Sequence, residues 1–128
     1  MQFIDLKTQT KRIEERVLAR FKAILEQGAF IMGPEIQELE KQLAEFTATK
    51  HCLSVSSGTD ALLMALMALD IKPGDEVITS PFSFFATAEV IAFLGAKPVF
   101  VDIDPKSYNI DPNRIEDAIS KKDRKSVV

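Results

Sequence analysis

Residues 74–104 read GDEVITSPFSFFATAEVIAFLGAKPVFVDID, and this stretch decides the fold. Residues 76–79 are a short, mostly apolar run directly after a Pro-Gly turn signal, which predicts a strand. Residues 84–94 predict a helix that ends before Gly95, and residues 98–103 predict a second strand. The run 98–103 is continuously apolar, as in a strand that is covered on both faces. A strand, a helix and a strand in this order indicate a parallel βαβ unit.

The flanking segments extend the same alternation. Residues 51–55 predict a further strand before a turn at residues 56–58, and residues 61–69 are apolar all round, which indicates a buried helix. Downstream, residues 111–119 predict a last helix that opens on an Asp-Pro pair. We therefore expect residues 51–128 to form a βαβαβα core of the α/β class with a mostly parallel sheet.

Residues 1–50 form a helical N-terminal segment in this interpretation. Apolar residues recur at helical spacing from Ile13 to Leu25, and Gly28 follows where a glycine cap would end the helix. After a short loop, Pro34 takes a natural first position of a second amphipathic helix. The apolar faces of these two helices could pack on a sheet or on a partner subunit.

The C-terminal residues suggest an interrupted domain. The basic run 121–125 is interpreted as a solvated turn, and residues 126–128 as the first residues of another strand. The strands of a parallel sheet need to be paired and covered. We therefore expect the 128 residues to be the N-terminal fragment of a larger protein, and we expect this fragment to self-associate or to be unstable.

Composition and charge exclude several functional classes. Lys and Arg number 16 against 19 Asp and Glu, a net charge of −3, which argues against a nucleic-acid-binding protein. A single cysteine excludes an intrachain disulfide framework and a multi-cysteine zinc site, and a single histidine excludes a histidine metal cluster. No stretch reaches the roughly 18 consecutive apolar residues of a membrane helix, and the N-terminus shows no signal-peptide pattern. We expect a cytoplasmic protein with no metal site.

The sharpest candidate site is Ser57-Gly58-Thr59, where the turn after the first expected strand meets a helix. Free backbone N–H groups at the positive end of a helix dipole suit a phosphate, and glycine lets an anion approach the backbone closely. The alternative is an ordinary helix N-cap formed by Thr59 or Asp60. The segment is neither a Walker A loop nor a dinucleotide fingerprint, because the glycines and the lysine of those motifs are missing.

Three phenylalanines follow the expected strand 76–79, at the edge where α/β sheets bind ligands. Their rings could stack on a planar ligand. For Phe82 and Phe85 we prefer a place in the core, whereas for Phe84 the residue pattern leaves core and stacking equally open.

Four further candidate groups receive structural interpretations. Asp102 and Asp104 lie at the same expected sheet edge, but an aspartate before a proline favours a turn at Asp104. Cys52 is interpreted as a small buried hydrophobic residue. His51 is interpreted as a strand-edge residue with no catalytic task.

Four motifs in combination resemble the sugar aminotransferases of the DegT/DnrJ/EryC1/StrS family, which are fold-type I pyridoxal-phosphate enzymes. The motifs are SGTDAL at 57–62, GDEVI at 74–78, ATAE at 86–89 and GAKPVFVDID at 95–104. The resemblance extends over essentially the whole chain. It implies that residues 1–128 are the N-terminal portion of the large, cofactor-binding domain, without the small C-terminal domain of the family.

The resemblance also assigns cofactor contacts to individual residues. In the family, the Ser-Gly-Thr segment holds the phosphate of pyridoxal 5′-phosphate, which implies this role for Ser57, Gly58 and Thr59. The aromatic residue at the position of Phe84 stacks on the pyridine ring. The anion-binding pattern and the possible stacking face agree with these two assignments.

A second set of implied contacts involves the substrate. The loop that contains Phe30 and Gly33 lies near the dimer interface in the family, where active sites are shared between subunits and the sugar nucleotide binds. The resemblance therefore implies a homodimer in the intact enzyme, with these two residues near the substrate.

Transamination needs two further groups, and in the family both belong to motifs that follow the segments seen here. One is the lysine that binds the cofactor as a Schiff base, and the other is the aspartate that pairs with the pyridine nitrogen. No lysine in this chain lies in the corresponding context. We therefore expect no catalytic residue among the 128 residues, and no transamination by this chain alone.

The resemblance implies an intact enzyme that transfers an amino group from an amino acid, expected to be glutamate, to a keto group on a nucleotide-linked sugar. Its product would feed polysaccharide or related glycan synthesis. Within the family, the match is most similar to enzymes that aminate a UDP-linked N-acetylated keto-hexuronic acid at C3. Two alternatives stay open: a pyridoxal-phosphate-dependent sugar dehydratase of the same family, and a non-catalytic module that binds phosphate or a nucleotide sugar.

Overall fold

The computed structural model describes residues 3–120 and 123–126. The chain divides into two compact units, residues 1–54 and residues 55–128. Each unit has its own secondary structure and is described by itself.

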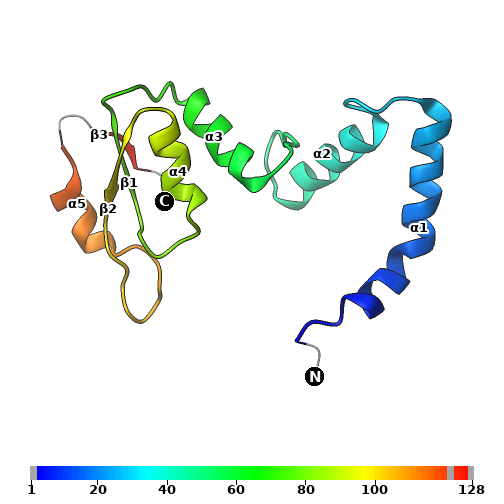
Figure 1. Cartoon of the computed structure of the whole chain (residues 1–128), viewed down its shortest axis with the longest axis horizontal. Helices are drawn as coiled ribbons and strands as arrows, with labels where there is room; N and C mark the ends of the chain where they lie inside the picture. Colours follow the sequence, from blue (N-terminus) through cyan, green and yellow to red (C-terminus); the bar gives the residue numbers. More distant parts are fainter. Residues whose placement is uncertain (1–2, 121–122, 127–128) are drawn as a thin grey trace. The chain divides into compact units, whose positions relative to one another are not determined.

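The first unit consists of two helices, α1 (Leu6–Gln27) and α2 (Pro34–Phe46) (Figure 1). Gly28 ends α1 in the left-handed conformation, with φ 67°, and its N–H donates to the carbonyl of Ile24. Pro34 is the first residue of α2, a position where a missing N–H costs nothing. The predicted glycine cap and the predicted proline start are both confirmed.

A bidentate ion pair joins the two helices of this unit. Arg20 on α1 donates to both carboxylate oxygens of Glu38 on α2, at 2.7 and 3.0 Å. An exposed ion pair of this kind is screened by solvent and contributes little to stability. No residue of either helix is buried, so the apolar stripes predicted from the sequence are present but uncovered in this unit.

The second unit is built on a parallel sheet. Within the described residues the sheet has three strands in the order β2-β1-β3, namely β1 (Glu76–Thr79), β2 (Lys97–Phe100) and β3 (Asp123–Ser126) (Figure 1). Both pairings of the central strand β1 are parallel. The predicted α/β class with a parallel sheet is confirmed, and β1 has the predicted bounds.

Helices α3 (Gly58–Ala68) and α4 (Ala86–Phe93) pack against each other, and α4 also packs on β1 and β2. Their shared core is apolar and consists of Leu66, Ile71, Val77, Val90, Ile91 and Ala96. The short helices η1 (Pro112–Arg114) and α5 (Ile115–Ala118) occupy the segment predicted as the last helix. Helix α4 begins two residues later than predicted, and Gly95 follows it with φ 75°.

Two predicted strands differ from the structure. Residues 51–55 form no strand, because they pair with none of the three strands in the described sheet, and a strand needs a hydrogen-bonded partner. Strand β2 ends at Phe100 and lies at the edge of that sheet with both of its end residues exposed. The expectation that the run 98–103 is covered on both faces is therefore wrong.

The C-terminal strand begins earlier than predicted. Residues 123–126 form β3 beside β1, where a solvated turn was expected over residues 121–125. Pairing with the free side of β1 overrides the polar composition of this segment, because backbone hydrogen bonds do not depend on side-chain type. Residues 121–122 of the expected turn and residues 127–128 of the expected strand lie outside the described residues.

Burial is less extensive than the sequence predicts. Of the residues in α3, only Leu66 is buried, and Met64 and Met67 are exposed, so this helix is not covered all round. Cys52 is half-buried rather than buried. Apolar composition identifies the side chains that can be buried, but a neighbouring element has to cover them.

None of the helices in the described ranges combines the length with the apolar character that a bilayer crossing requires. Over the same ranges, no three His, Cys, Asp or Glu side chains gather as ligands of a metal ion would.

Candidate functional site

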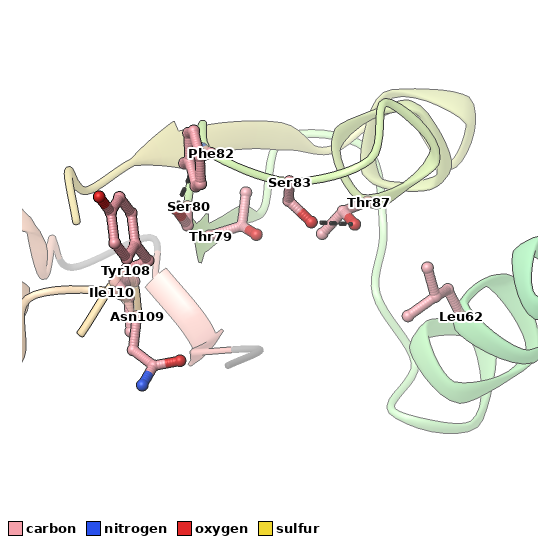
Figure 2. Close-up of a pocket in the computed structure, with 9 residues that line it drawn as sticks. All are labelled: Leu62, Thr79, Ser80, Phe82, Ser83, Thr87, Tyr108, Asn109 and Ile110. Atoms are coloured by element: carbon pink, nitrogen blue, oxygen red, sulfur yellow. Dashed lines mark hydrogen bonds between the residues drawn. The ribbon is translucent and has the colours of Figure 1, made fainter. Parts of the chain in front are cut away.

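A cavity of about 360 Å³ lies at the carboxyl end of β1, the edge at which parallel sheets bind ligands (Figure 2). Its lining comes from α3, β1, the loop between β1 and α4, the first turn of α4 and the loop after β2. It comprises Leu62, Thr79, Ser80, Phe82, Ser83, Thr87, Tyr108, Asn109 and Ile110. No lining side chain carries a charge at neutral pH. The cavity thus offers hydroxyl and amide groups beside aromatic rings, which suits a ligand that both stacks and forms hydrogen bonds.

One lining residue, Thr79, comes from β1, the central strand of the described sheet. Thr79 is the last residue of β1 and is only 3% exposed. Next to it, the Oγ of Ser80 accepts a hydrogen bond from the N–H of Phe82 at 3.1 Å. The hydroxyls of Ser83 and Thr87 are hydrogen-bonded at 3.2 Å (Figure 2). These contacts fix the segment that leaves β1 and turns into α4.

The rim of the cavity carries an aromatic pair that the motif pattern does not reveal. The rings of Phe82 and Tyr108 have centroids 5.8 Å apart and planes tilted by 32° (Figure 2). Tyr108 comes from the loop after β2, which is closed by an antiparallel bridge between Ile103 and Ile110. The predicted turn at Asp104 is the sequence signal that could have located this residue, because it reverses the chain toward the sheet edge.

Ser57 caps the N-terminus of α3, since its Oγ accepts a hydrogen bond from the N–H of Asp60 at 3.1 Å. The alternative interpretation named Thr59 or Asp60 as the cap, and it is wrong about the residue, because the extended backbone that a cap requires occurs at Ser57. The N–H groups of Gly58 and Thr59 have no intrahelical acceptor, and the part of the chain that the structure describes supplies no other. Two donors therefore remain at the positive end of an 11-residue helix.

The carboxylate of Asp60 lies at the same helix end. It accepts hydrogen bonds from the hydroxyl of Ser56 and, at 2.9 Å, from that of Ser57. These bonds, with the one from Ser56 the larger cause, lower the pKa of Asp60 from its ordinary value. Because both serine hydroxyls donate to Asp60, recognition of another anion here depends on the two N–H groups and the Thr59 hydroxyl.

The three phenylalanines after β1 are exposed. Phe82 and Phe85, for which a core position was preferred, are 63% and 72% exposed, so that preference is wrong. Phe84 is 79% exposed and does not line the cavity, and its carbonyl accepts a hydrogen bond from the N–H of Thr87 at 3.1 Å. A segment that leaves a sheet edge keeps its side chains in solvent unless another element covers them.

The aspartates after β2 have structural partners. Asp104 accepts hydrogen bonds from the N–H groups of Lys106 and Ser107, at 3.0 and 2.8 Å, which confirms the predicted turn. The bonds from Ser107, and next that from Lys106, lower the pKa of Asp104. Asp102 faces Arg114 at 3.9 Å. Neither aspartate lines the cavity.

The remaining candidates, Phe30 and Gly33, belong to the first unit. Phe30 is exposed, and Gly33 is buried as the N-cap of α2. A Cβ on Gly33 would lie 2.5 Å from the carbonyl oxygen of Ala29, so the backbone requires glycine there. His51 is exposed in the irregular segment before α3.

The sequence profile of the DegT/DnrJ/EryC1/StrS aminotransferase family matches residues 11–128. The chain belongs to this family. One curated relative, the UDP-2-acetamido-2-deoxy-3-oxo-D-glucuronate aminotransferase of Pseudomonas aeruginosa, is 52% identical over 120 residues. The alignment covers 94% of this chain and 33% of that relative, so the chain spans about a third of the relative's length.

Solved structures share the fold, and one of them is a DegT DnrJ EryC1 StrS aminotransferase. That aminotransferase, from Brucella abortus, matches with a TM-score of 0.86 at 48% identity, over 91% of this chain and 31% of that protein. NtdA from Bacillus subtilis, solved with its bound cofactor PMP, matches with a TM-score of 0.92 at 35% identity, over 98% and 29%. The fold is accordingly that of the N-terminal part of a fold-type I aminotransferase domain, and the cofactor of the family is pyridoxal 5′-phosphate.

The residues at the N-terminal end of α3 fit the phosphate of this cofactor. Two N–H donors and the Thr59 hydroxyl lie at the positive end of the helix, which favours a phosphate. A Cβ on Gly58 would meet nothing within 4 Å, so there is space for an anion to approach the backbone. Leu62, one turn further along α3, lines the cavity, so the same helix borders both features.

Proposed function

We propose that this chain provides the phosphate-binding part of the cofactor site in a nucleotide-sugar aminotransferase. Ser57, Gly58 and Thr59 form the phosphate site, and Phe84 provides a ring face for the pyridine ring. The observation that supports this best is the pair of N–H donors at the start of α3, for which the described residues contain no acceptor. When bound, pyridoxal phosphate supplies an electron sink and a carrier for the amino group.

The groups of the chain have separate tasks in this proposal. The N–H groups of Gly58 and Thr59 donate to phosphate oxygens, and the Thr59 hydroxyl adds a third donor. Ser57 keeps the helix end folded through its bond with the N–H of Asp60. The exposed ring of Phe84 can stack without displacing a core contact.

For the substrate, we propose a UDP-linked, N-acetylated keto-hexuronic acid that receives its amino group at C3, with glutamate as the donor. The 52% identity to an enzyme whose name specifies such a sugar supports this choice. Phe30 and Gly33 contribute to the sugar-nucleotide site of a homodimeric, cytoplasmic enzyme. The product serves the synthesis of a surface polysaccharide or a related glycan.

The cavity lining contains no lysine, and amino transfer by this cofactor requires one. We therefore propose that the chain on its own binds the cofactor but does not transfer an amino group. Free pyridoxal phosphate is itself yellow, and borohydride reduces its aldehyde, so the cofactor alone is the reference. A stoichiometric mixture of the chain with pyridoxal phosphate should show no additional band, at longer wavelength than that of the free cofactor, that borohydride abolishes. Such a band would indicate a Schiff base with a lysine of this chain and would overturn this part of the proposal.

Thr59→Ala tests the phosphate site. We expect the affinity for pyridoxal phosphate to fall by about 1–3 kcal/mol, or roughly 5- to 150-fold, because a hydrogen bond to a charged phosphate is lost. Equilibrium titration followed by the absorbance of the cofactor, with inorganic phosphate as a competitor, measures this affinity.

The matched control is Thr10→Ala on α1. The hydroxyl of Thr10 donates to the carbonyl of Leu6 at 2.9 Å, so the variant removes the same group from an exposed helix outside the proposed site. We expect its affinities for cofactor and phosphate to equal those of the wild type. Equal losses in both variants, or no loss in Thr59→Ala, would contradict the proposed function.

A further inference from the structure

The loops after β1 and β2 meet at one aromatic contact. Phe82 lies in the loop after β1 (residues 80–85), Tyr108 lies in the loop after β2 (residues 101–111), and their ring centroids are 5.8 Å apart (Figure 2). Among the described residues, this is the only pair of aromatic rings in contact. The contact therefore connects two loops at the rim of the cavity.

Tyr108 has a backbone conformation that bulky residues rarely adopt. Its φ of 60° lies in the left-handed region, where asparagine and glycine are common. Two hydrogen bonds of 2.9 Å hold the loop, from the Tyr108 N–H to the carbonyl of Asp104 and from the Asp104 N–H to the carbonyl of Asn109. An unfavourable conformation that is held by such bonds suggests a task for the side chain at that position.

Residues 80–85, which include Phe82, lie outside any helix or strand. The N–H of Phe82 donates to the Oγ of Ser80, but the side chain of Phe82 is largely exposed, and the chain stays irregular until α4 begins at Ala86. Ser83 ties the C-terminal part of this loop to Thr87 on α4, and the ring of Tyr108 supports the loop at Phe82. Phe84 lies two residues after Phe82, so its position depends on how this loop is held.

We propose that Tyr108 is a positioning residue. Through Phe82, it holds the loop 80–85 in place and thereby sets the position of Phe84 for the planar ring of the cofactor. The role of Phe84 rests on the proposed function, whereas the loop contact does not. Phosphate recognition at the start of α3 is separate from this contact.

The contact can be tested without a ligand. Chymotrypsin cleaves after aromatic residues, and the exposed phenylalanines of the loop, Phe82, Phe84 and Phe85, are its sites there. Mass spectrometry under native conditions gives the initial cleavage rate at these sites. Tyr108→Asn removes the ring but suits the left-handed backbone, so we expect roughly fivefold faster cleavage without a lower melting temperature. Tyr108→Phe keeps the ring and should cleave within about twofold of the wild-type rate.

Three outcomes would overturn the proposal. The first is an unchanged cleavage rate in Tyr108→Asn. The second is faster cleavage together with a lower melting temperature, because the ring would then stabilise the unit as a whole. The third concerns the double variant of Tyr108→Asn with Phe82→Leu, measured only at Phe84 and Phe85 because Phe82→Leu alters a cleavage site. It should cleave there no faster than the faster single variant. If the increases in cleavage rate from the two single variants add up in the double variant, Tyr108 does not hold the loop by contacting Phe82.

Ligand titrations separate this inference from the proposed function. We expect Tyr108→Asn to weaken pyridoxal phosphate binding roughly fivefold and to leave inorganic phosphate binding unchanged. Equal losses for both ligands, or no loss for either, would overturn the role toward the cofactor ring. If the wild-type chain binds neither ligand, the proposed function fails, and the cleavage rates alone decide whether Tyr108 holds the loop.

Discussion

At the scale of single residues, the start of α3 brings a carboxylate close to the proposed phosphate site. Asp60 is ionised at neutral pH, and a phosphate at the same helix end would be repelled by it. The hydroxyls of Ser56 and Ser57 donate to this carboxylate and so partly neutralise its charge. The two serines therefore reduce a repulsion that would otherwise weaken anion binding.

Ser56→Ala should raise the pKa of Asp60 toward its ordinary value of 3.8, because the largest cause of its lowering is removed. A carboxyl with a lowered pKa stabilises the fold above its ordinary pKa and loses this contribution as the pH falls through the lowered value. The variant should therefore lose less stability than the wild type in that acidic range. NMR titration of the Asp60 carboxyl carbon measures the pKa directly.

The matched control for this measurement is Ser83→Ala. The hydroxyl of Ser83 bonds with that of Thr87 and not with Asp60, so the pKa of Asp60 should be unchanged. A similar shift of the Asp60 pKa in both variants would show that the Ser56 hydroxyl is not its cause.

At the scale of elements, the glycines at the starts of α2 and α3 differ in what surrounds them. A Cβ on Gly33 would lie 2.5 Å from a backbone oxygen, whereas a Cβ on Gly58 would meet nothing within 4 Å. We expect Gly33→Ala to lower the free energy of unfolding by about 1–3 kcal/mol. Gly58→Ala should change it by less than about 0.5 kcal/mol. Urea unfolding followed by circular dichroism compares the two, and equal losses would contradict this distinction.

The element ends that the sequence predicts correctly have local causes. Gly28 and Pro34 set the end of α1 and the start of α2 through their own backbone properties. The predicted strand over residues 51–55 and the all-round burial of α3 depend instead on a neighbouring element. The residues of a segment do not specify that neighbour, so these two predictions are wrong.

Those parts of the candidate site that depend on local sequence could be predicted as well. The turn and the apolar helical run after it are enough to place Ser57 to Thr59 at a helix start, and the strand 76–79 places the phenylalanines beyond a strand end. The contact of Phe82 with Tyr108 was not predictable, because it joins two loops and needs a left-handed backbone at a residue that rarely adopts one.

At the scale of the whole molecule, exposed apolar side chains are the prominent feature. In the second unit Met64, Met67, Phe93 and Phe100 are exposed, and within the described residues no strand pairs with the outer edge of β2. Exposed apolar surface and unpaired strand edges favour association. We expect the chain to self-associate, with a mass by light scattering that rises with protein concentration.

Two substitutions to glutamate test the origin of this association. Met67→Glu places a charge on the exposed side of α3 and should lower the measured mass at a given concentration. Gln9→Glu adds the same charge to the exposed surface of α1 and should leave the mass unchanged. A wild-type mass that stays at the monomer value over the concentration range would contradict the prediction.

Strand β1 is paired on both sides, and Val77, Ile78 and Thr79 are 0%, 1% and 3% exposed. Amide hydrogens in such a strand exchange with solvent only when much of the unit opens, whereas those in exposed loops exchange through local fluctuations. The strand β1 at the base of the cavity thus opens only when much of the unit unfolds, whereas the loops at its rim can move by local fluctuations. A ligand can enter and leave while every hydrogen bond of the sheet remains in place.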